Sequence, residues 1–436
     1  MTDGAVPGVP VFDLVGVGFG PSNLAMAVAL AEYNEQAPPG LRVTSQFLER
    51  QTTFGWHPGM LIQDATMQVS FLKDLVTLRN PASRFSFLCY LQARGRLMDF
   101  VNHKTLFPLR IEFHDYLEWA AAQVDDVVAY GREVVAVEPM PGGEYFDVRD
   151  NTGNVIRARN LVLGTGLRPR MPDGVRRGDR IWHNSELLSR IDEIEDPQRF
   201  VVVGAGQSGA EVAAFLHERF PRAEVCPVFA RYGYSPSDDS AFANRIFDPE
   251  AVDQFYDSPP AVKQQLLGYH ANTNYSVVDI DLINELYRRE YQEKVRGTRR
   301  LRMFNVSRTT EVVRTGQGVR ATVVSLTTGE QTVLDADVAV FATGYLPADP
   351  LAQLGELARY CLRDEEGALR VGRDYRVWTA PEVSGGIYLQ GGTEHTHGIT
   401  SSLLSITSVR VGEILQSIVD QRPLVQAPRP AYAVNG

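Results

Sequence analysis

Two short glycine-rich segments have the residue types and the spacing of nucleotide-binding loops. They read Gly16-Val17-Gly18-Phe19-Gly20-Pro21 and Gly204-Ala205-Gly206-Gln207-Ser208-Gly209. Glycines at these spacings permit a tight turn and let the backbone approach a diphosphate, which binds at the positive end of the following helix. Proline in place of the third glycine of the first loop is compatible with this, because proline suits the first turn of a helix. The sequence therefore predicts two dinucleotide sites.

One residue downstream of each loop indicates which dinucleotide binds there. Glu49 ends the strand after the first loop, where a carboxylate accepts hydrogen bonds from ribose hydroxyls, so this site suits FAD, which has no 2′-phosphate. Arg231 takes the corresponding place after the second loop, where a cation suits the 2′-phosphate of NADPH. Taken singly, each residue is also compatible with a solvated surface charge. Together, the two loops predict electron transfer between a flavin and a nicotinamide.

The hydrophobic pattern around each loop predicts a strand, a turn, a helix and a second strand. The first unit combines a strand at 11–15, a helix at 22–32 and a strand at 41–48. The second combines a strand at 200–203, a helix ending near 219 and a strand at 224–229. This βαβ arrangement therefore occurs twice, as in two Rossmann-like domains.

Further elements follow from the same patterns. Helices are expected at 110–119, 280–295 and 401–416, and strands at 127–137, 145–149, 155–157, 160–163, 310–314, 319–326 and 338–342. The last strand ends at Thr343 and Gly344, small residues that let the backbone approach the flavin domain closely.

The predicted fold class is α/β: a two-dinucleotide-binding-domain flavoprotein with two Rossmann-like domains and a small helical substrate-binding insertion. We expect a discontinuous FAD domain at 1–185 and 337–436, the second part including the C-terminal tail. We expect an NADPH domain at 186–235 and 298–336, interrupted by the helical substrate-binding segment at 236–297.

Composition narrows the class of partner. A chain of 436 residues with a formal net charge of −10 has no general attraction for nucleic acid or anionic lipid, which favours a small-molecule substrate. The first ten residues lack a signal peptide pattern, so we expect a cytoplasmic protein. Cys89, Cys226 and Cys361 are far apart in sequence and are expected to be buried packing residues. No metal-binding motif is expected, since His395 and His397 have no partner motif.

Five further segments carry a resemblance to a known family. They are FGWHPGM at 54–60, MQVSFLKDL at 67–75, DDSAFAN at 238–244, NTNY at 272–275 and ATGY at 342–345. Together they resemble the microbial N-hydroxylating flavin monooxygenases, and within these the L-ornithine N5-monooxygenases of hydroxamate siderophore biosynthesis. The resemblance runs from about residue 11 to residue 415.

The resemblance implies a role for several residues. The substrate α-carboxylate would bind Lys73 and Asn244, and the side-chain amine would meet the backbone carbonyl of Asn274 and be oriented by Ser405. The flavin would lie near Gln68 and in a pocket with Trp56 and His57. Elementary chemistry agrees with these roles, because lysine is a point donor to a carboxylate and a neutral carbonyl does not stabilise the protonated amine.

The implied reaction uses FAD, NADPH and O₂ and needs no catalytic side chain. NADPH reduces FAD, O₂ then gives a C4a-hydroperoxyflavin, and the neutral δ-amine of L-ornithine attacks it to give N5-hydroxyornithine. The resemblance also implies a homo-oligomer, a tetramer or a dimer. L-lysine or a diamine stays open as the substrate, because one methylene changes binding by only about 1–3 kcal/mol. A pyridine-nucleotide reductase with a protein partner is a more distant alternative, whose dithiol form requires paired cysteines.

Overall fold

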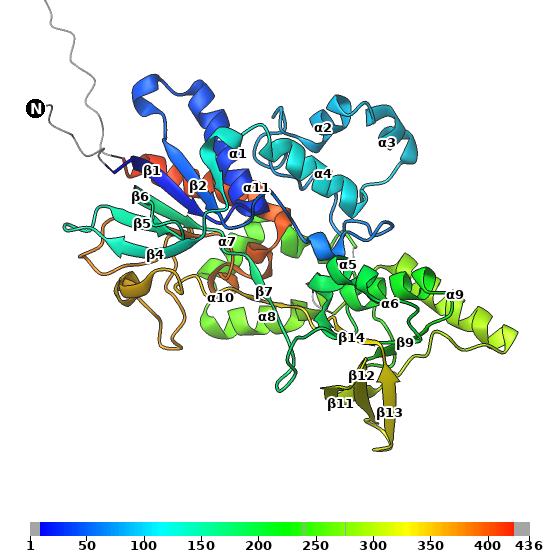
Figure 1. Ribbon diagram of the computed structural model, residues 1–436. Coiled ribbons are helices and arrows are strands. Elements are labelled where there is room, and N and C mark those ends of the chain that lie inside the picture. Colours follow the sequence, from blue (N-terminus) through cyan, green and yellow to red (C-terminus); the bar gives the residue numbers. More distant parts are fainter. Residues whose placement is uncertain (1–8, 239, 275, 423–436) are drawn as a thin grey trace, which may run out of the picture.

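The chain folds into two α/β units that lie side by side (Figure 1). The computed structural model describes residues 9–238, 240–274 and 276–422, and for residues 271–274 and 402 it describes the backbone alone. Among the described residues, no helix is both long enough and apolar enough to cross a lipid bilayer.

The first unit is built on a seven-stranded sheet in the order β3-β2-β1-β6-β5-β4, with β16 paired to β6. Strands β4 and β5 form an antiparallel excursion beside β6, and the other strands pair in parallel. The strands are β1 (Val11–Val17), β2 (Ser45–Glu49), β3 (Val128–Tyr130), β4 (Val134–Pro139), β5 (Phe146–Asp150), β6 (Val155–Leu163) and β16 (Gly386–Leu389).

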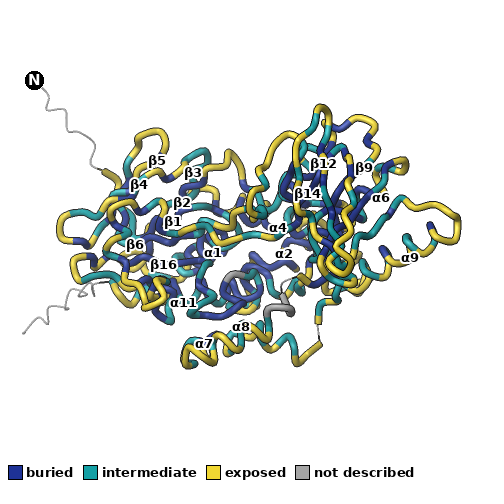
Figure 2. Tube along the Cα trace, turned by 90° about the horizontal axis from the view of Figure 1, so that it is seen from below, coloured by how far each residue is buried: buried dark blue, intermediate teal, exposed yellow. Residues whose placement is uncertain are grey.

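Two helices cover one face of this sheet at its centre. α1 (Pro21–Gln36) has an unbroken buried run at 23–30, as expected for a helix that is enclosed on most sides. α11 (Thr407–Asp420) packs against α1, and the tube in Figure 2 is mostly coloured as buried or intermediate along both helices. α2 (Phe87–Ala93), α3 (Leu97–His103) and α4 (Arg110–Ala121) form a separate helical layer beside α1 (Figure 1).

The second unit is built on a four-stranded parallel sheet in the order β10-β9-β14-β8. Its strands are β8 (Ile181–His183), β9 (Arg199–Val203), β10 (Glu224–Val228) and β14 (Val338–Phe341). α6 (Gln207–Arg219) follows β9, and the short α5 (Leu187–Arg190) follows β8. An antiparallel sheet of β11 (Ser307–Arg314), β12 (Val319–Ser325) and β13 (Gln331–Ala336) adjoins this unit, and β7 (Leu167–Pro169) pairs with β15 (Tyr345–Pro347).

A helical segment follows β10. Its helices are α7 (Pro249–Asp257), α8 (Pro260–Asn274) and α9 (Ile280–Arg296), and the short α10 (Glu394–His397) contacts α7. In Figure 1, α8 lies beneath the first unit, whereas α9 extends outward beside α6. The segment therefore reaches both units.

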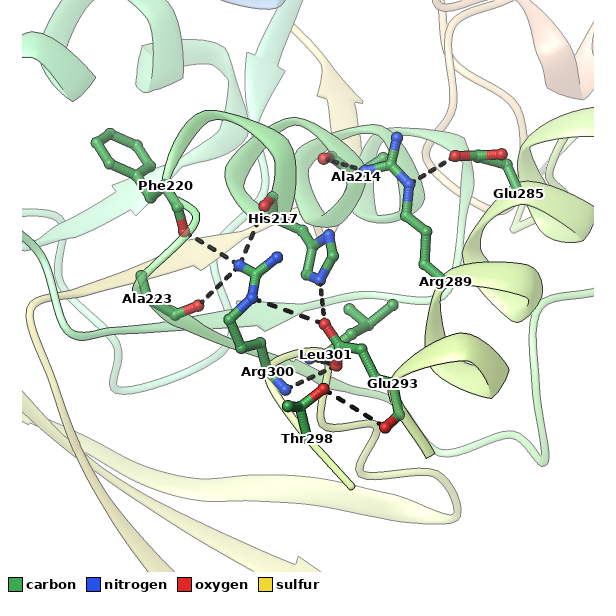
Figure 3. Close-up of polar contacts among 10 residues, drawn as sticks. All are labelled: Ala214, His217, Phe220, Ala223, Glu285, Arg289, Glu293, Thr298, Arg300 and Leu301. Atoms are coloured by element: carbon green, nitrogen blue, oxygen red, sulfur yellow. Dashed lines mark hydrogen bonds and ion pairs between the residues drawn. The ribbon is translucent and has the colours of Figure 1, made fainter. Parts of the chain in front are cut away.

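A buried polar network joins α9 to α6 (Figure 3). His217 Nε2 lies 2.7 Å from Glu293 Oε1, and Glu293 Oε2 accepts hydrogen bonds from the backbone N–H groups of Arg300 (2.7 Å) and Leu301 (2.8 Å). The Arg300 guanidinium in turn donates to the carbonyl oxygens of His217 and Phe220, each at 3.2 Å. These bonds fix the start of the chain segment that returns to the second unit.

Both predicted βαβ units are present, and three details differ from expectation. The strands expected at 155–157 and 160–163 are one strand, β6, because it pairs with β5 on one side and β1 on the other. The C-terminal helix begins at Thr407 rather than 401, because the extended backbone of Leu403 interrupts it. Cys226 and Cys361 are buried, but Cys89 is exposed on α2. The domain boundaries stay a prediction. β8 and β14, which pair within the second sheet, lie just inside the ranges predicted for the FAD domain, 1–185 and 337–436.

Candidate active site between the two glycine loops

The first glycine loop is shaped to receive a phosphate group. Gly16 is in β1, and Gly18 follows it with φ = +82°, where an added Cβ would lie 2.6 Å from the carbonyl oxygen of Gly164. Pro21 is the first residue of α1, whose N-terminus has no side-chain cap and no acidic residue in its first turn. The uncapped N–H groups and the positive end of the helix dipole suit the diphosphate of a dinucleotide.

Glu49 is buried at the C-terminal end of β2, beside this loop. Its carboxylate accepts hydrogen bonds from the backbone N–H groups of Phe19 (2.5 Å) and Gln51 (2.8 Å). These contacts fix the carboxylate between β2 and the loop, and each carboxylate oxygen can accept a further hydrogen bond. Its position is the one that the sequence predicts for a ribose partner.

The second glycine loop repeats this design at the N-terminus of α6. Gly204 has φ = +144°, and an added Cβ would lie 2.3 Å from the carbonyl oxygen of Ala342. Gly206 is the N-cap, without a side-chain cap or an acidic residue in the first turn, and Ser208 and Gly209 lie in that turn. Gln207 bridges the loop to α9, because it accepts from the N–H of Asp279 at 2.8 Å.

Arg231 lies just beyond β10, as expected, and is half-buried. Its guanidinium donates to the carbonyl oxygen of Ser276 at 2.8 Å. An added Cβ on Gly206 would lie 3.3 Å from Cα of the same Ser276, so Arg231 and the second loop meet at one residue. The remaining guanidinium donors are available to an anion at that position.

An aromatic cluster fills the space where the two units meet. The ring centroid of His57 lies 5.2 Å from that of Trp56 and 5.7 Å from that of Tyr345. The His183 ring lies 4.8 Å from Tyr345. Burial, together with the nearby Arg110 guanidinium, lowers the pKa of His57 to about 4. His57 is therefore neutral at neutral pH.

Thr343 and Gly344 carry the chain from the second unit back toward the first. The Thr343 hydroxyl donates to the carbonyl oxygen of Arg170 at 2.5 Å, and the Gly344 carbonyl oxygen accepts from Arg170 N at 3.0 Å and lies 2.9 Å from His183 Nε2. Close backbone approach therefore occurs beside the paired strands β7 and β15, and the role of Thr343 and Gly344 near the flavin stays a prediction.

Lys73 and the segment that contains Asn244 come together. The Lys73 ammonium lies 5.2 Å from the ring centroid of Phe247, which belongs to the same short helix (Ala243–Phe247) as Asn244. Partial burial lowers the pKa of Lys73, and Asp248 partly opposes this. Asn244 is half-buried, and its side-chain amide donates to the Ser240 carbonyl oxygen at 3.2 Å.

The remaining predicted substrate residues lie on adjoining segments. The helical turn at 399–402 contacts the Asn244 helix, α8 and the turn at 404–406 that holds Ser405. The Ser405 hydroxyl is buried and has no hydrogen-bond partner among the described residues. Asn274 is the last residue of α8, and its side chain lies outside the described part of the structure. Gln68 is exposed, beside the buried Met67.

An ion pair between the two units was not predictable from the sequence. The Arg110 guanidinium, at the start of α4, makes two hydrogen bonds to the Glu211 carboxylate on α6, of 2.6 and 2.9 Å. Both side chains are largely buried, and Arg110 also donates to the Met60 carbonyl oxygen at 3.0 Å. Neither residue belongs to a recognisable motif, so no sequence signal could have paired them.

Within the described residues, no cluster of side chains is suited to hold a metal ion.

Comparison with known proteins gives one consistent family. The family model for L-lysine 6-monooxygenase/L-ornithine 5-monooxygenase matches residues 10–347. An L-ornithine N(5)-monooxygenase of Burkholderia cepacia is 41% identical over 95% of this chain and 96% of its own. The structure of the Kutzneria sp. 744 ornithine N-hydroxylase with reduced FAD, NADP⁺ and L-ornithine is 48% identical, covers 95% of this chain and 100% of its own, and has a TM-score of 0.91. The structure of the Pseudomonas syringae L-lysine 6-monooxygenase is 31% identical to this chain. It covers 93% of this chain and 99% of its own, and has a TM-score of 0.82.

Proposed function

Because the chain belongs to the L-lysine 6-monooxygenase/L-ornithine 5-monooxygenase family, we propose that it is an FAD- and NADPH-dependent L-ornithine N5-monooxygenase. The observation that carries this proposal is the 48% identity, over 95% of the chain, to an ornithine N-hydroxylase whose structure contains FAD, NADP⁺ and L-ornithine. The product, N5-hydroxyornithine, is a precursor for hydroxamate siderophores or related natural products.

The two glycine loops hold the two dinucleotides in this proposal. FAD binds at Gly16, Gly18 and Pro21 with Glu49 on its ribose, and NADPH binds at the second loop with Arg231 on its 2′-phosphate. The uncapped N-termini of α1 and α6 support both assignments, since neither has an acidic residue in its first turn to repel phosphate. When bound, the flavin accepts hydride from NADPH and activates O₂ for transfer of one oxygen atom.

The chain's own residues orient the substrate and its amine. Lys73 and Asn244 bind the α-carboxylate, while the Asn274 carbonyl and the Ser405 hydroxyl face the δ-amine. The Ser405 hydroxyl, which has no partner among the described residues, supports this role, because a buried hydroxyl without a hydrogen bond is unfavourable until a ligand meets it. The overall reaction balances as R–NH₂ + O₂ + NADPH + H⁺ giving R–NHOH + NADP⁺ + H₂O.

L-ornithine is favoured over L-lysine as the substrate by the similarity. The L-lysine 6-monooxygenase is 31% identical to this chain, compared with 48% for the ornithine N-hydroxylase. A diamine substrate would leave the Lys73 ammonium without a carboxylate, and Lys73 is already partly desolvated.

The test is a substrate panel with purified enzyme. L-ornithine, L-lysine and putrescine are each supplied with NADPH, and hydroxylamine product, NADPH consumption and hydrogen peroxide are measured. We expect L-ornithine to give product nearly equal to the NADPH consumed, and the others to give mainly hydrogen peroxide. Tighter coupling with L-lysine would overturn the substrate assignment but leave the reaction class intact.

We also propose that the enzyme is a cytoplasmic homo-oligomer, a dimer or a tetramer. The outer face of α9 supports association, since Tyr287, Tyr291 and Val295 recur at helical spacing and are 71%, 61% and 69% exposed. Light scattering coupled to size-exclusion chromatography measures the mass in solution.

A further inference from the structure

A buried arginine lies behind the first glycine loop. Arg410, in the first turn of α11, is 1% exposed. Its guanidinium donates to the Ser401 carbonyl oxygen, to the hydroxyl oxygens of Ser22 and Thr407 at 3.2 Å each, and to Gln390 Oε1 at 3.4 Å. All four acceptors are uncharged.

Arg410 has no countercharge within the described residues. None of their ion pairs involves Arg410, and the nearby Glu413 carboxylate is held by Arg373 through hydrogen bonds of 2.8 and 2.9 Å. Arginine stays protonated in proteins, so the interior holds a charge that hydrogen bonds satisfy but do not neutralise. A buried charge without a countercharge is strongly unfavourable.

The position of this charge makes its electrostatic cost larger. Ser22 lies in the first turn of α1, where the helix dipole is already positive. Gln390 extends the contact toward the loop: its amide donates to the Ser22 carbonyl oxygen and to Asn23 Oδ1, both at 3.0 Å. Asn23 in turn donates to the Gly18 carbonyl oxygen at 2.7 Å. Arg410 therefore reaches the loop through a continuous chain of hydrogen bonds.

We propose that Arg410 is a positioning residue for FAD, whose positive charge behind the first glycine loop is offset by the FAD diphosphate when it binds. The inference rests on the proposed FAD site at that loop. One anion at the N-terminus of α1 would satisfy both the helix dipole and the buried guanidinium. Arg410 acts through Ser22 and Gln390, so its effect on FAD is electrostatic and depends on its charge.

The rival explanation is that Arg410 only fastens α11 to α1. Three variants separate the two. Arg410→Gln removes the charge and keeps a donor, and Arg410→Lys keeps the charge. Arg79→Gln is the matched control. Arg79 also holds α1, through a 2.6 Å ion pair with Glu32, but its charge is neutralised by that carboxylate. Each protein is freed of FAD, its Tm is measured with and without FAD, and the FAD Kd is obtained by fluorescence titration.

We expect Arg410→Gln to raise the FAD Kd at least about tenfold and to reduce the FAD-induced rise in Tm, with little or no loss in apoprotein Tm. Arg410→Lys should recover most of the affinity. Arg79→Gln should lower the Tm of both forms equally and leave the Kd unchanged.

Equal loss of Tm in the apo and FAD-bound forms of Arg410→Gln, with the FAD Kd unchanged, would overturn the proposal. If Arg410→Gln does not fold, Arg410→Lys decides: near-wild-type FAD affinity supports the charge role, and loss of affinity overturns it. Absence of FAD binding by the wild-type protein would instead refute the proposed function.

Discussion

Lys73 stands out among the single residues because its ammonium is partly desolvated and lies against the helix of Asn244. We expect Lys73→Ala to leave FAD binding and NADPH-dependent flavin reduction intact, because Lys73 belongs to neither glycine loop. The kcat/KM for hydroxylation of L-ornithine should fall at least about 30-fold, since a desolvated charge contact contributes roughly 2–5 kcal/mol. Product assays with stopped-flow flavin reduction measure the two halves separately.

Coupling of the reaction is the second readout for this variant. A misplaced amine should give proportionally more hydrogen peroxide for each NADPH consumed. Lys294→Ala is the control, because Lys294 is 72% exposed on α9 and, among the described residues, pairs only with Glu290. Wild-type affinity and coupling in Lys73→Ala would contradict the carboxylate role and favour a diamine substrate.

Arg231 decides the nicotinamide preference if it binds the 2′-phosphate. Arg231→Ala should raise the KM for NADPH about tenfold or more while that for NADH changes little, because a hydrogen bond to a charged group contributes roughly 1.5–3 kcal/mol. Steady-state flavin reduction measured with NADPH and with NADH gives the ratio of the two KM values. The control Arg308→Ala, which removes an exposed arginine from β11, should leave this ratio unchanged. An unchanged NADPH-to-NADH ratio in Arg231→Ala would mean that another group reads the phosphate.

At the scale of elements, the polar network between α6 and α9 should make the stability of the fold depend on pH (Figure 3). Burial lowers the pKa of His217, although the hydrogen bond to Glu293 opposes this. Burial alone would raise the pKa of Glu293, but hydrogen bonds from Leu301, His217 and Arg300 outweigh it and lower that pKa. Both groups therefore contribute stability that is present above their ordinary values, near 6.5 and 4.5, and is lost as the pH falls through the lowered values.

The variant His217→Gln tests this, because glutamine can donate to Glu293 but does not titrate. The free energy of unfolding, from urea denaturation at pH 7.5, 6.5 and 5.5, should fall more steeply in wild-type protein than in the variant. Other buried histidines contribute equally to both proteins, so the difference between the two slopes isolates His217. If the free energy of unfolding changed equally with pH in both proteins, the pKa of His217 would be the same in the folded and unfolded states.

At the scale of the whole molecule, the Arg110–Glu211 pair is the principal charged link between the α4 layer and α6 in the described structure. Glu211→Ala leaves the Arg110 guanidinium buried without its carboxylate, which costs about 3–5 kcal/mol. We expect a lower Tm and slower flavin reduction by NADPH, because the units lose a fixed relative orientation. Thermal denaturation and stopped-flow absorbance measure these effects.

Glu218→Ala provides the comparison on the same helix. Glu218 is 65% exposed and pairs with Arg289 across the surface of α6 and α9, so its loss should cost no more than about 1 kcal/mol. If both variants had the same Tm and the same rate of flavin reduction, Arg110–Glu211 would have no special role between the units.

The sequence by itself determined the two βαβ units and the family. The loops at Gly16 and Gly204 could be predicted because strand, tight turn and helix are encoded within one short stretch of chain by hydrophobic period and glycine placement. The helices α4, α6 and α9 were predicted nearly to their ends for the same reason. The start of α11 was not, because the extended backbone of Leu403 separates α11 from the helical turn at 399–402.

Only the tertiary structure decided which charges meet. Arg410 reaches Ser22, Arg110 reaches Glu211, and Lys73 reaches Phe247, each from a distant part of the sequence. Hydrophobic period and residue propensity describe neighbours along the chain, whereas a buried charge is compensated through space by whatever groups folding brings beside it. For that reason the sequence could name Lys73 by resemblance, but it gave no sign of Arg410.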